Sequence, residues 1–271
     1  MNILDEIIEH KRKETEERKS LYPVRLLEQS IYFETRPVSM CHYIRRSDKS
    51  GIIAEIKRKS PSKGVINGHV SVERTSIGYM QAGASAISVL TDKKFFGGSN
   101  EDLATARKYN FCPILRKDFT IDEYQIIEAK SIGADVILLI AAALDSSAVR
   151  SLTRFAQSLG LEVLLEVHNR EELEATSEAG ANLIGVNNRS LKTFHIDLET
   201  SKTLAPLIPG EVVKVSESGI ESPQTILELK EHGFDGFLMG QNFMQHSRPE
   251  GACKSFIDEL RYLQTQNTKI S

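Results

Sequence analysis

The sequence predicts a (β/α)8 barrel with an N-terminal helical extension, which is an α/β fold. Short apolar runs rich in Val, Ile and Leu recur at regular intervals from Ser50 onward, as buried strands do. Amphipathic segments separate these runs, and such an alternation is typical of a parallel sheet covered by helices. The chain has 271 residues, which matches the roughly 250 residues of a typical barrel.

The extension is predicted over residues 1–48, and the barrel over residues 49–271, with both parts in a single domain overall. The stretch LDEIIEHKRKETEERK (4–19) has helical periodicity and many charge pairs at i,i+4 spacing. The stretch PVRLLEQSIYF (23–33) could form a second, short helix. Two positions stay open for the extension, since it could cover the bottom or side of the barrel or help to cover the mouth of the active site.

Eight apolar runs supply the predicted strands. They are GIIAEIK (51–57), SAISVL (85–90), CPILRK (112–117), DVILLI (135–140), LEVLLE (161–166), NLIGVN (182–187), EVVKVS (211–216) and DGFLMG (235–240). A doubly wound open sheet is the competing arrangement, but it usually carries a GxGxxG turn after its first strand, and none is present here. The closed barrel is therefore preferred.

The segments between the runs have the features of helices. Many begin at Ser, Asp or Asn, which are preferred N-caps, and end at a Gly that leads directly into the next strand. Clear examples span residues 72–84, 122–134, 146–160, 169–181 and 222–234.

Composition and charge favour a small-molecule partner over a polymer or a membrane. The net charge of −3 and pI of about 6.2 give no general attraction to nucleic acid or anionic lipid. No apolar stretch is long enough to span a membrane, the N-terminus lacks the apolar segment of a signal peptide, and the three cysteines show no CxxC spacing. We therefore expect a cytoplasmic protein that is a monomer or a weak homo-oligomer.

Charged residues end several of the predicted strands on the face that points into the barrel. Strand alternation places Ile53, Glu55 and Lys57 on one face, and the same sorting gives inward series in other strands. Those series end at Lys117, Glu166, Asn187 and Glu217. Because desolvation makes a buried ion pair a poor source of stability, and because barrel enzymes react at the carboxyl ends of their strands, these groups indicate an active site.

Two other kinds of residue near the strand ends need an interpretation. A single polar residue there more often lies on the solvated rim, and His168 is interpreted in this way. Three carboxylates could bind a metal ion, but the two lysines among them would repel it, so no metal is expected.

Glycine-containing turns after the last two strands indicate a phosphate site. SESGI (216–220) follows the seventh strand, MGQNFM (239–244) follows the eighth, and the loops after these two strands commonly bind phosphate in this fold. Ser60, in KSPSKG, could add a hydroxyl. A phosphorylated small molecule is therefore the expected substrate.

Seven motifs in order resemble the indole-3-glycerol phosphate synthase family over nearly the whole chain. They are EIKRKSPSKG, LTDKKFFGGS, RKDF, LLEVH, GVNNR, SESGI and FLMG. The resemblance implies that 1-(2-carboxyphenylamino)-1-deoxyribulose 5-phosphate closes to an indole with loss of carbon dioxide and water, without a cofactor or metal. It implies catalytic roles for Glu55, Lys57, Lys117, Glu166, Asn187, Glu217 and Ser218.

The resemblance also implies where the substrate lies. Phosphate contacts fall on or near Ser60, Gly219, Gly240 and Gln241, and Arg189 belongs to the GVNNR motif. The walls for the anthranilate ring fall on Pro61, Leu90, Phe96, Phe119, Leu138 and Leu191, each of which could equally be ordinary core. Asp92 departs from the glutamate that is frequent in the family, and we expect little consequence because it is placed in a rim loop.

The implied reaction suggests a role for each group. Lys117 is the leading candidate for the general acid that protonates the ketone oxygen, and Lys57 would pair with the substrate carboxylate or share the proton transfer. Glu166 and Glu55 are the candidates for the acid and base of dehydration. The remaining two polar groups, Asn187 and Glu217, would orient substrate hydroxyls and the lysines.

Two other functions are compatible with a barrel that binds phosphate. A lysine could act as a Schiff-base nucleophile in an aldolase-type barrel, or the chain could be an isomerase that acts on a sugar phosphate. A barrel that only binds a ligand is the third possibility, but none of the charged strand ends is missing.

Overall fold

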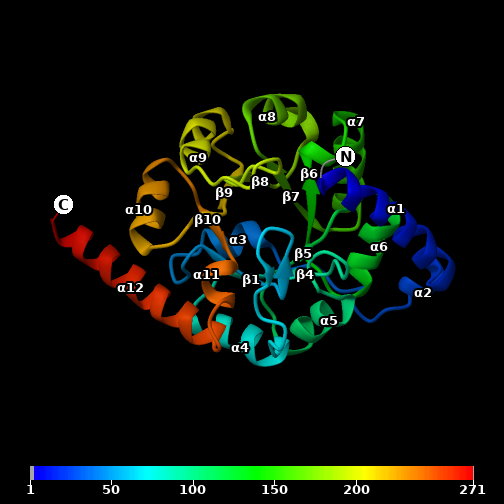
Figure 1. The fold of residues 1–271 in the computed structure, drawn as a ribbon, viewed down its shortest axis with the longest axis horizontal. Coiled ribbons are helices and arrows are strands. Elements are labelled where there is room, and N and C mark those ends of the chain that lie inside the picture. The colour runs from blue at the N-terminus through cyan, green and yellow to red at the C-terminus, as the bar shows by residue number, and fades with distance from the viewer. Residues whose placement is uncertain (1–2, 271) are drawn as a thin grey trace.

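Eight parallel strands close into a barrel in the computed structural model, which describes residues 3–270 (Figure 1). The ring is complete because β1 (Ile52–Ile56) pairs with β4 (Ala86–Leu90) on one side and with β10 (Gly236–Met239) on the other. The strands between them are β5 (Ile114–Lys117), β6 (Val136–Ile140), β7 (Glu162–Val167), β8 (Leu183–Asn187) and β9 (Val213–Glu217). The predicted (β/α)8 barrel is therefore confirmed.

Helices surround this ring and connect its strands (Figure 1). They are α4 (Val72–Ala82), α5 (Asn100–Tyr109), α6 (Glu123–Ser131), α7 (Ser146–Ser158), α8 (Arg170–Thr176), α9 (Glu199–Leu204), α10 (Pro223–Glu231) and α12 (Pro249–Ile270). The N-cap residues of α4, α6 and α8 are Ser71, Asp122 and Asn169, and each side chain accepts a hydrogen bond from the first turn of its helix. No helix within residues 3–270 is long and apolar enough to cross a membrane.

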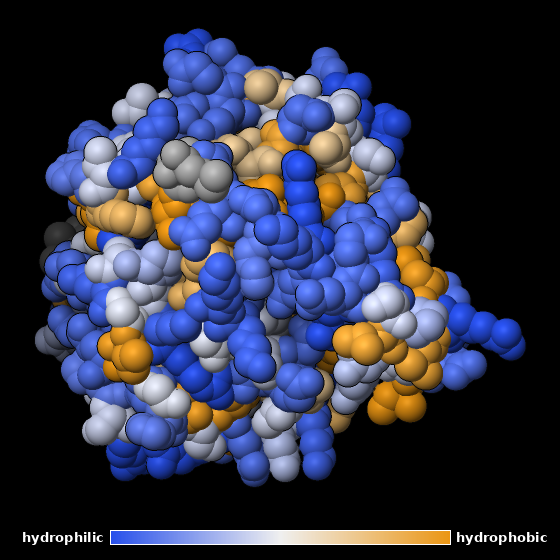
Figure 2. Space-filling model, turned by 45° about the vertical axis from the view of Figure 1, so that its right-hand side comes forward, coloured by the Kyte–Doolittle hydropathy of each residue, from blue (hydrophilic) through white to orange (hydrophobic). Residues whose placement is uncertain are grey.

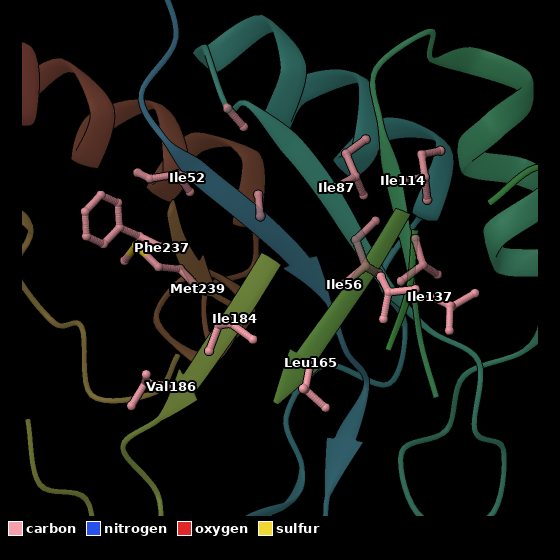
Figure 3. Close-up of a cluster of buried hydrophobic side chains, with 14 of the residues drawn as sticks. Ile52, Ile56, Ile87, Ile114, Ile137, Leu165, Ile184, Val186, Phe237 and Met239 are labelled. Atoms are coloured by element: carbon pink, nitrogen blue, oxygen red, sulfur yellow. The ribbon is translucent and has the colours of Figure 1, made fainter. Parts of the chain in front are cut away.

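Two apolar layers hold the barrel together, one inside the ring of strands and one between the strands and the helices. Ile53, Leu115 and Leu164 belong to the inner layer. Ile52 and Ile56 belong to the outer layer, part of which Figure 3 shows. The alternation predicted for β1 is therefore correct, and the side chains that continue the inner series reach the top of the barrel.

A short helix, α3 (Met40–Ile44), closes the bottom of the barrel. Met40 and Ile44 are buried and belong to the inner apolar layer. The carboxylate of Glu162, at the start of β7, accepts hydrogen bonds from the backbone N–H of Met40 at 2.7 Å and from the hydroxyl of Ser39 at 2.5 Å. The sequence did not reveal this helix, because five residues are too few to show a periodicity.

The first helix, α1 (Ile3–Leu21), lies against the side of the barrel and reaches its mouth. Arg18 pairs with Glu128 on α6, whereas Lys11 pairs with Asp92 and Asp118, which follow the carboxyl ends of β4 and β5. With α3 at the bottom, the extension therefore occupies both of the positions left open by the sequence. The division into residues 1–48 and 49–271 stays a prediction.

Asp92 lies in the loop after β4, as expected, but its side chain is buried instead of exposed on the rim. Its Oδ2 lies 3.0 Å from Nζ of Lys11, and its Oδ1 accepts a hydrogen bond from the backbone N–H of Phe95 at 2.7 Å. The loop after β4 therefore wraps around the carboxylate of Asp92, and Lys11 of α1 pairs with it.

The second predicted helix of the extension is shorter than expected. Only α2 (Val24–Leu27) forms, and turns follow it. Exposed apolar side chains gather near this element, namely Leu21, Leu26 and Ile31. Figure 2 shows that most of the visible face is hydrophilic and that apolar patches interrupt it.

Candidate active site

A cavity of about 520 Å³ opens at the carboxyl ends of the strands. Every residue to which the sequence analysis gave a catalytic or substrate-binding role lines this cavity, although the roles themselves stay predictions. The lining includes Glu55, Lys57, Ser60, Pro61, Leu90, Phe96, Lys117, Phe119, Leu138, Glu166, Asn187, Arg189, Leu191, Glu217, Ser218, Gly219, Gly240 and Gln241.

Two ion-paired groups lie in this cavity. Nζ of Lys117 lies 2.7 Å from Oε2 of Glu166 and 3.1 Å from Oε2 of Glu217. Nζ of Lys57 lies 2.6 Å from Oε1 of Glu55. The three carboxylates are almost completely buried, and the strand register aligns β7, β8 and β9 so that their polar ends meet.

Two glycines provide the space for these carboxylates. A Cβ at Gly185, which points into the barrel from β8, would collide with Oε1 of Glu217. A Cβ at Gly240, after β10, would collide with Oε1 of Glu55. Both positions therefore require glycine for packing around the charged groups.

The ammonium of Lys117 is held in its charged form. Burial alone would lower the pKa of Lys117, but attraction from Glu166 and Glu217 outweighs burial and raises the pKa well above its usual value. A lysine in this state can donate a proton to a substrate oxygen, and it is a poor nucleophile because its nitrogen has no free electron pair.

The two carboxylates beside Lys117 differ from each other. Burial would raise the pKa of Glu166, but Lys117 and His168 hold it well below its usual value. Burial raises the pKa of Glu217 to about 7, because Lys117 offsets burial only in part and the charge on Glu166 adds to it. Glu166 is therefore suited to accept a proton, and Glu217 is suited to carry one near neutral pH.

Asn187 links the carboxylate of Glu166 to the loop after β8 by two hydrogen bonds. Its Nδ2 donates to Oε1 of Glu166 at 3.1 Å, and its Oδ1 accepts from the backbone N–H of Arg189 at 3.0 Å. Arg189 forms a bridge to Ile196, which folds the loop into a small hairpin beside the cavity. The amide of Asn187 thus fixes the orientation of one carboxylate oxygen.

The turn after β9 has the backbone shape of an anion site. Ser218 and Gly219 are consecutive residues with left-handed φ angles of 67° and 79°. Such turns expose consecutive backbone N–H groups in a concave arrangement that suits anions. The side chain of Asn242, in α11 (Gln241–Met244), donates to the backbone oxygen of Glu221 at 3.1 Å and joins this turn to the loop after β10.

An apolar wall lies in the same cavity. The rings of Phe96 and Phe119 face each other with centroids 5.9 Å apart. The sequence analysis missed a further part of this wall, because Ile3, Leu4 and Ile7 of α1 also line the cavity. Their spacing on an amphipathic helix indicated a buried stripe, but no local signal indicated which surface the stripe covers.

The expectation that His168 lies on the solvated rim is wrong. Its side chain is 9% exposed, its Nε2 lies 3.2 Å from Oε1 of Glu166, and its Nδ1 lies 3.2 Å from Oε2 of Glu172. Burial would lower the pKa of His168, but these two carboxylates raise it to about 10. Its position two residues after Glu166, on the same face, was the signal that could have revealed it.

No group of three or more His, Cys, Asp or Glu side chains in the part of the chain that the structure describes is arranged to hold a metal ion. The residues at hand supply proton donors, proton acceptors and backbone N–H groups.

The fold and the cavity together define a (β/α)8-barrel enzyme whose acids and bases project from the carboxyl ends of its strands. The family model for indole-3-glycerol phosphate synthase matches residues 4–256. The chain therefore belongs to the indole-3-glycerol phosphate synthase family.

Similar proteins agree with this assignment. A protein of Bacteroides thetaiotaomicron named indole-3-glycerol phosphate synthase is 46% identical over 260 residues, which cover 96% of this chain and 99% of that protein. A protein of the same name from Thermoanaerobacter pseudethanolicus is 42% identical over 261 residues, covering 96% and 98%. Among solved structures, N-acetylmannosamine-6-phosphate 2-epimerase from Clostridium perfringens matches 82% of this chain and 96% of its own with a TM-score of 0.59, but at 16% identity it supports the fold alone.

Proposed function

We propose that this protein catalyses the reaction for which its family is named. In that reaction 1-(2-carboxyphenylamino)-1-deoxyribulose 5-phosphate closes to indole-3-glycerol phosphate with loss of carbon dioxide and water. The observation that carries this proposal is the charged ammonium of Lys117, which lies between the buried carboxylates of Glu166 and Glu217.

The first step is the formation of a carbon–carbon bond. The arene carbon that bears the carboxylate attacks the ketone carbon of the ribulose part, and the ketone oxygen takes a proton and becomes a hydroxyl. Lys117 is the proposed donor of that proton, because its amine is fully charged and it lies among the groups that line the cavity. Glu166 and Glu217 hold its Nζ in place during the attack.

The second step is decarboxylation. The carboxylate leaves as carbon dioxide, and the electrons of its bond restore the aromatic ring. Lys57 is the proposed partner of the substrate carboxylate before this step, since its side chain is partly exposed and its Nζ already binds a carboxylate, that of Glu55. A positive charge there positions the group and compensates for its burial.

The third step is dehydration, in which the new hydroxyl leaves as water and the five-membered ring becomes an indole. Glu166 is the proposed base, because it is ionised and near the catalytic lysine. Glu166 takes the proton of the anilinic N–H, and Glu55 is the proposed acid that gives a proton to the departing hydroxyl. Over the whole sequence one proton is taken up, while carbon dioxide and water are released.

The two ends of the substrate would occupy different parts of the cavity. We place the phosphate at the turn of Ser218 and Gly219 and near Gly240, where backbone N–H groups are available. We place the anthranilate ring against Phe96 and Phe119, since flat apolar walls suit an arene. Holding both ends would align the reacting carbons, and such orientation can contribute about 7–11 kcal/mol to catalysis.

A Schiff-base mechanism is less consistent with the geometry. A nucleophilic lysine must lose its proton, and the carboxylates around Lys117 strongly oppose that loss. Treatment with borohydride and a sugar-phosphate ketone would trap a covalent adduct on an aldolase-type lysine, and we expect no adduct here.

The variant Lys117→Ala tests the proposed acid. We expect product formation, followed by indole fluorescence, to fall by about 10²–10⁴-fold, which is the usual contribution of a positioned proton donor. The matched control is Lys214→Ala, because Lys214 is also a strand lysine but its Nζ donates to the backbone oxygen of Ala205 instead of facing the cavity. Full activity in a folded Lys117→Ala protein would refute the assignment.

A further inference from the structure

One ammonium serves two buried carboxylates in this site. Nζ of Lys117 lies 2.7 Å from Glu166 on β7 and 3.1 Å from Glu217 on β9, and β8 lies between these two strands. Two carboxylates so close to each other cannot both be ionised at low cost, because their charges repel in a poorly solvated space. A further group must therefore decide which of them keeps the charge.

The two carboxylates have different partners apart from Lys117. Oε1 of Glu166 lies 3.2 Å from Nε2 of His168 and accepts a hydrogen bond from Nδ2 of Asn187 at 3.1 Å. Oε1 of Glu217 has no hydrogen-bond partner among residues 3–270 and lies against Gly185. The negative charge is therefore better compensated on Glu166.

The imidazole of His168 is itself fixed by α8. Oε2 of Glu172 lies 3.2 Å from Nδ1 of His168 and also accepts a hydrogen bond from the backbone N–H of His168 at 2.8 Å. The other oxygen of Glu172 accepts from Nδ2 of Asn169 at 2.8 Å, and Asn169 is the N-cap residue of α8. With a carboxylate oxygen 3.2 Å from each ring nitrogen, the geometry favours a ring that carries hydrogen on both nitrogens, which is an imidazolium.

We propose that His168 is a positioning residue whose imidazolium holds Glu166 ionised and so leaves Glu217 as the carboxyl that carries the proton. This inference rests on the proposed function, since it assigns roles to two groups of that site. His168 does not line the cavity, so it acts on the substrate only through Glu166.

The charged groups around Glu166 and Glu217 are consistent with this assignment. Lys117 approaches from β5 and attracts both carboxylates, while Glu55 on β1 adds a negative charge that acts on Lys117 and Glu217. On the far side, Glu172 stabilises the charge of His168. The surroundings of Glu166 and Glu217 therefore differ in two charges, because the imidazolium lies beside Glu166 and the carboxylate of Glu55 acts on Glu217.

The variant His168→Gln tests the proposal through the pH dependence of kcat. Glutamine can still donate a hydrogen bond toward Glu166 but has no charge, so the pKa of Glu166 should rise. The acid limb of the kcat profile reports the essential base in the substrate complex, and we expect it to move to higher pH by about one unit. KM should change by less than about twofold, because His168 does not touch the cavity.

A matched variant separates this effect from a structural one. Asn169→Ala removes the N-cap of α8 and one hydrogen-bond partner of Glu172, but it leaves the side chains of Glu166, His168 and Glu172 unchanged. We expect it to lower the unfolding temperature and to leave the pH profile in place. The proposal is overturned if His168→Gln folds and has the wild-type acid limb, or if Asn169→Ala shifts the limb equally.

A direct measurement keeps this test independent of turnover. Nuclear magnetic resonance of the ring nitrogens in the wild-type protein without substrate should show both nitrogens of His168 protonated at pH 8, and Glu166→Gln should lower the pH at which one proton is lost. A ring that loses its proton near pH 6.5 would overturn the proposal even in an active enzyme. Absence of synthase turnover with an imidazolium at pH 8 would instead refute the proposed function and leave the pairing intact.

Discussion

At the scale of single residues, the site depends on two glycines as well as on its charged side chains. Gly185 and Gly240 are glycines because Glu217 and Glu55 occupy the space that a Cβ would fill. These carboxylates in turn bind the ammonium groups of Lys57 and Lys117. One methyl group added at either glycine would therefore disturb the charged groups of the cavity.

The variant Gly185→Ala tests this dependence. We expect the methyl group to displace the carboxylate of Glu217 and to lower kcat by about 10²-fold, as a shift of about 1 Å in a catalytic group can do. The change in KM should be smaller, since the proposed phosphate site uses backbone N–H groups and not the carboxylate of Glu217. Steady-state kinetics, together with the unfolding temperature, provides the measurement.

Gly210→Ala is the matched control for this variant. No described heavy atom lies within 4 Å of the position that its Cβ would take. We expect unchanged kcat and a slight gain in stability, because alanine restricts the unfolded chain more than glycine does. Wild-type kcat in Gly185→Ala would contradict the proposed placement of Glu217.

At the scale of elements, α1 connects the extension to the active site through one buried lysine. Lys11 lies 3.0 Å from Asp92 and 2.9 Å from Asp118, and the side chains of all three are almost completely buried. On the same helix, Ile3 and Ile7 complete the apolar wall of the cavity. Anchoring of α1 by Lys11 thus determines the shape of the proposed arene site.

The variant Lys11→Met should loosen this anchor. We expect a loss of about 3 kcal/mol in the free energy of unfolding at pH 7, because two buried carboxylates lose a positively charged partner, and we also expect a higher KM. Lys13→Met is the control, since Lys13 is exposed and pairs with the exposed Glu9. Equal stability of the two variants would show that the anchor contributes little.

The pH dependence of this loss has a definite direction. Burial would raise the pKa of Asp118, but Lys11 and Arg116 lower it to about 2. Because this value lies below the usual 3.8, Asp118 contributes stability above about pH 4, and that stability is lost as the pH falls through 2. The stability difference between wild type and Lys11→Met should therefore shrink in acid, and chemical denaturation at several pH values would measure it.

The strands and most long helices could be predicted because their signals are local. The inward series of β1 follows from alternation, and the ends of α4 and α6 follow from their caps. The short α3 could not be predicted, since its stability comes from Glu162, which is far away in the chain. The second helix was also predicted too long, and Leu26 and Ile31 in the predicted stretch stay exposed.

The predicted site residues meet in one cavity because the strand ends of a barrel converge. The positions of Glu166 and Asn187 followed from the alternation of side chains along their strands. The family resemblance supplied the residues of the loops. Asp92 and Lys11 were misread or missed because their partners come from distant segments of the chain, whereas His168 was misread although Glu166 and Glu172 lie within four residues of it. A cytoplasmic location and a monomeric or weakly associated state stay predictions.

At the scale of the whole molecule, closure of the barrel brings together groups that are far apart in the chain. Each of β1, β5, β7, β8 and β9 contributes one polar side chain to the floor of the cavity, and the turns after β9 and β10 supply backbone N–H groups. The separate ends of the cavity would hold the phosphate and the arene of one substrate. The central claim is that these groups catalyse indole formation by acting as acids and bases.

The most direct measurement is the stoichiometry of a complete turnover by the purified protein. With 1-(2-carboxyphenylamino)-1-deoxyribulose 5-phosphate at pH 7.5, we expect equal amounts of fluorescent indole product and carbon dioxide, with one proton taken up for each. Consumption of the substrate without an indole, or carbon dioxide release without ring closure, would contradict the account.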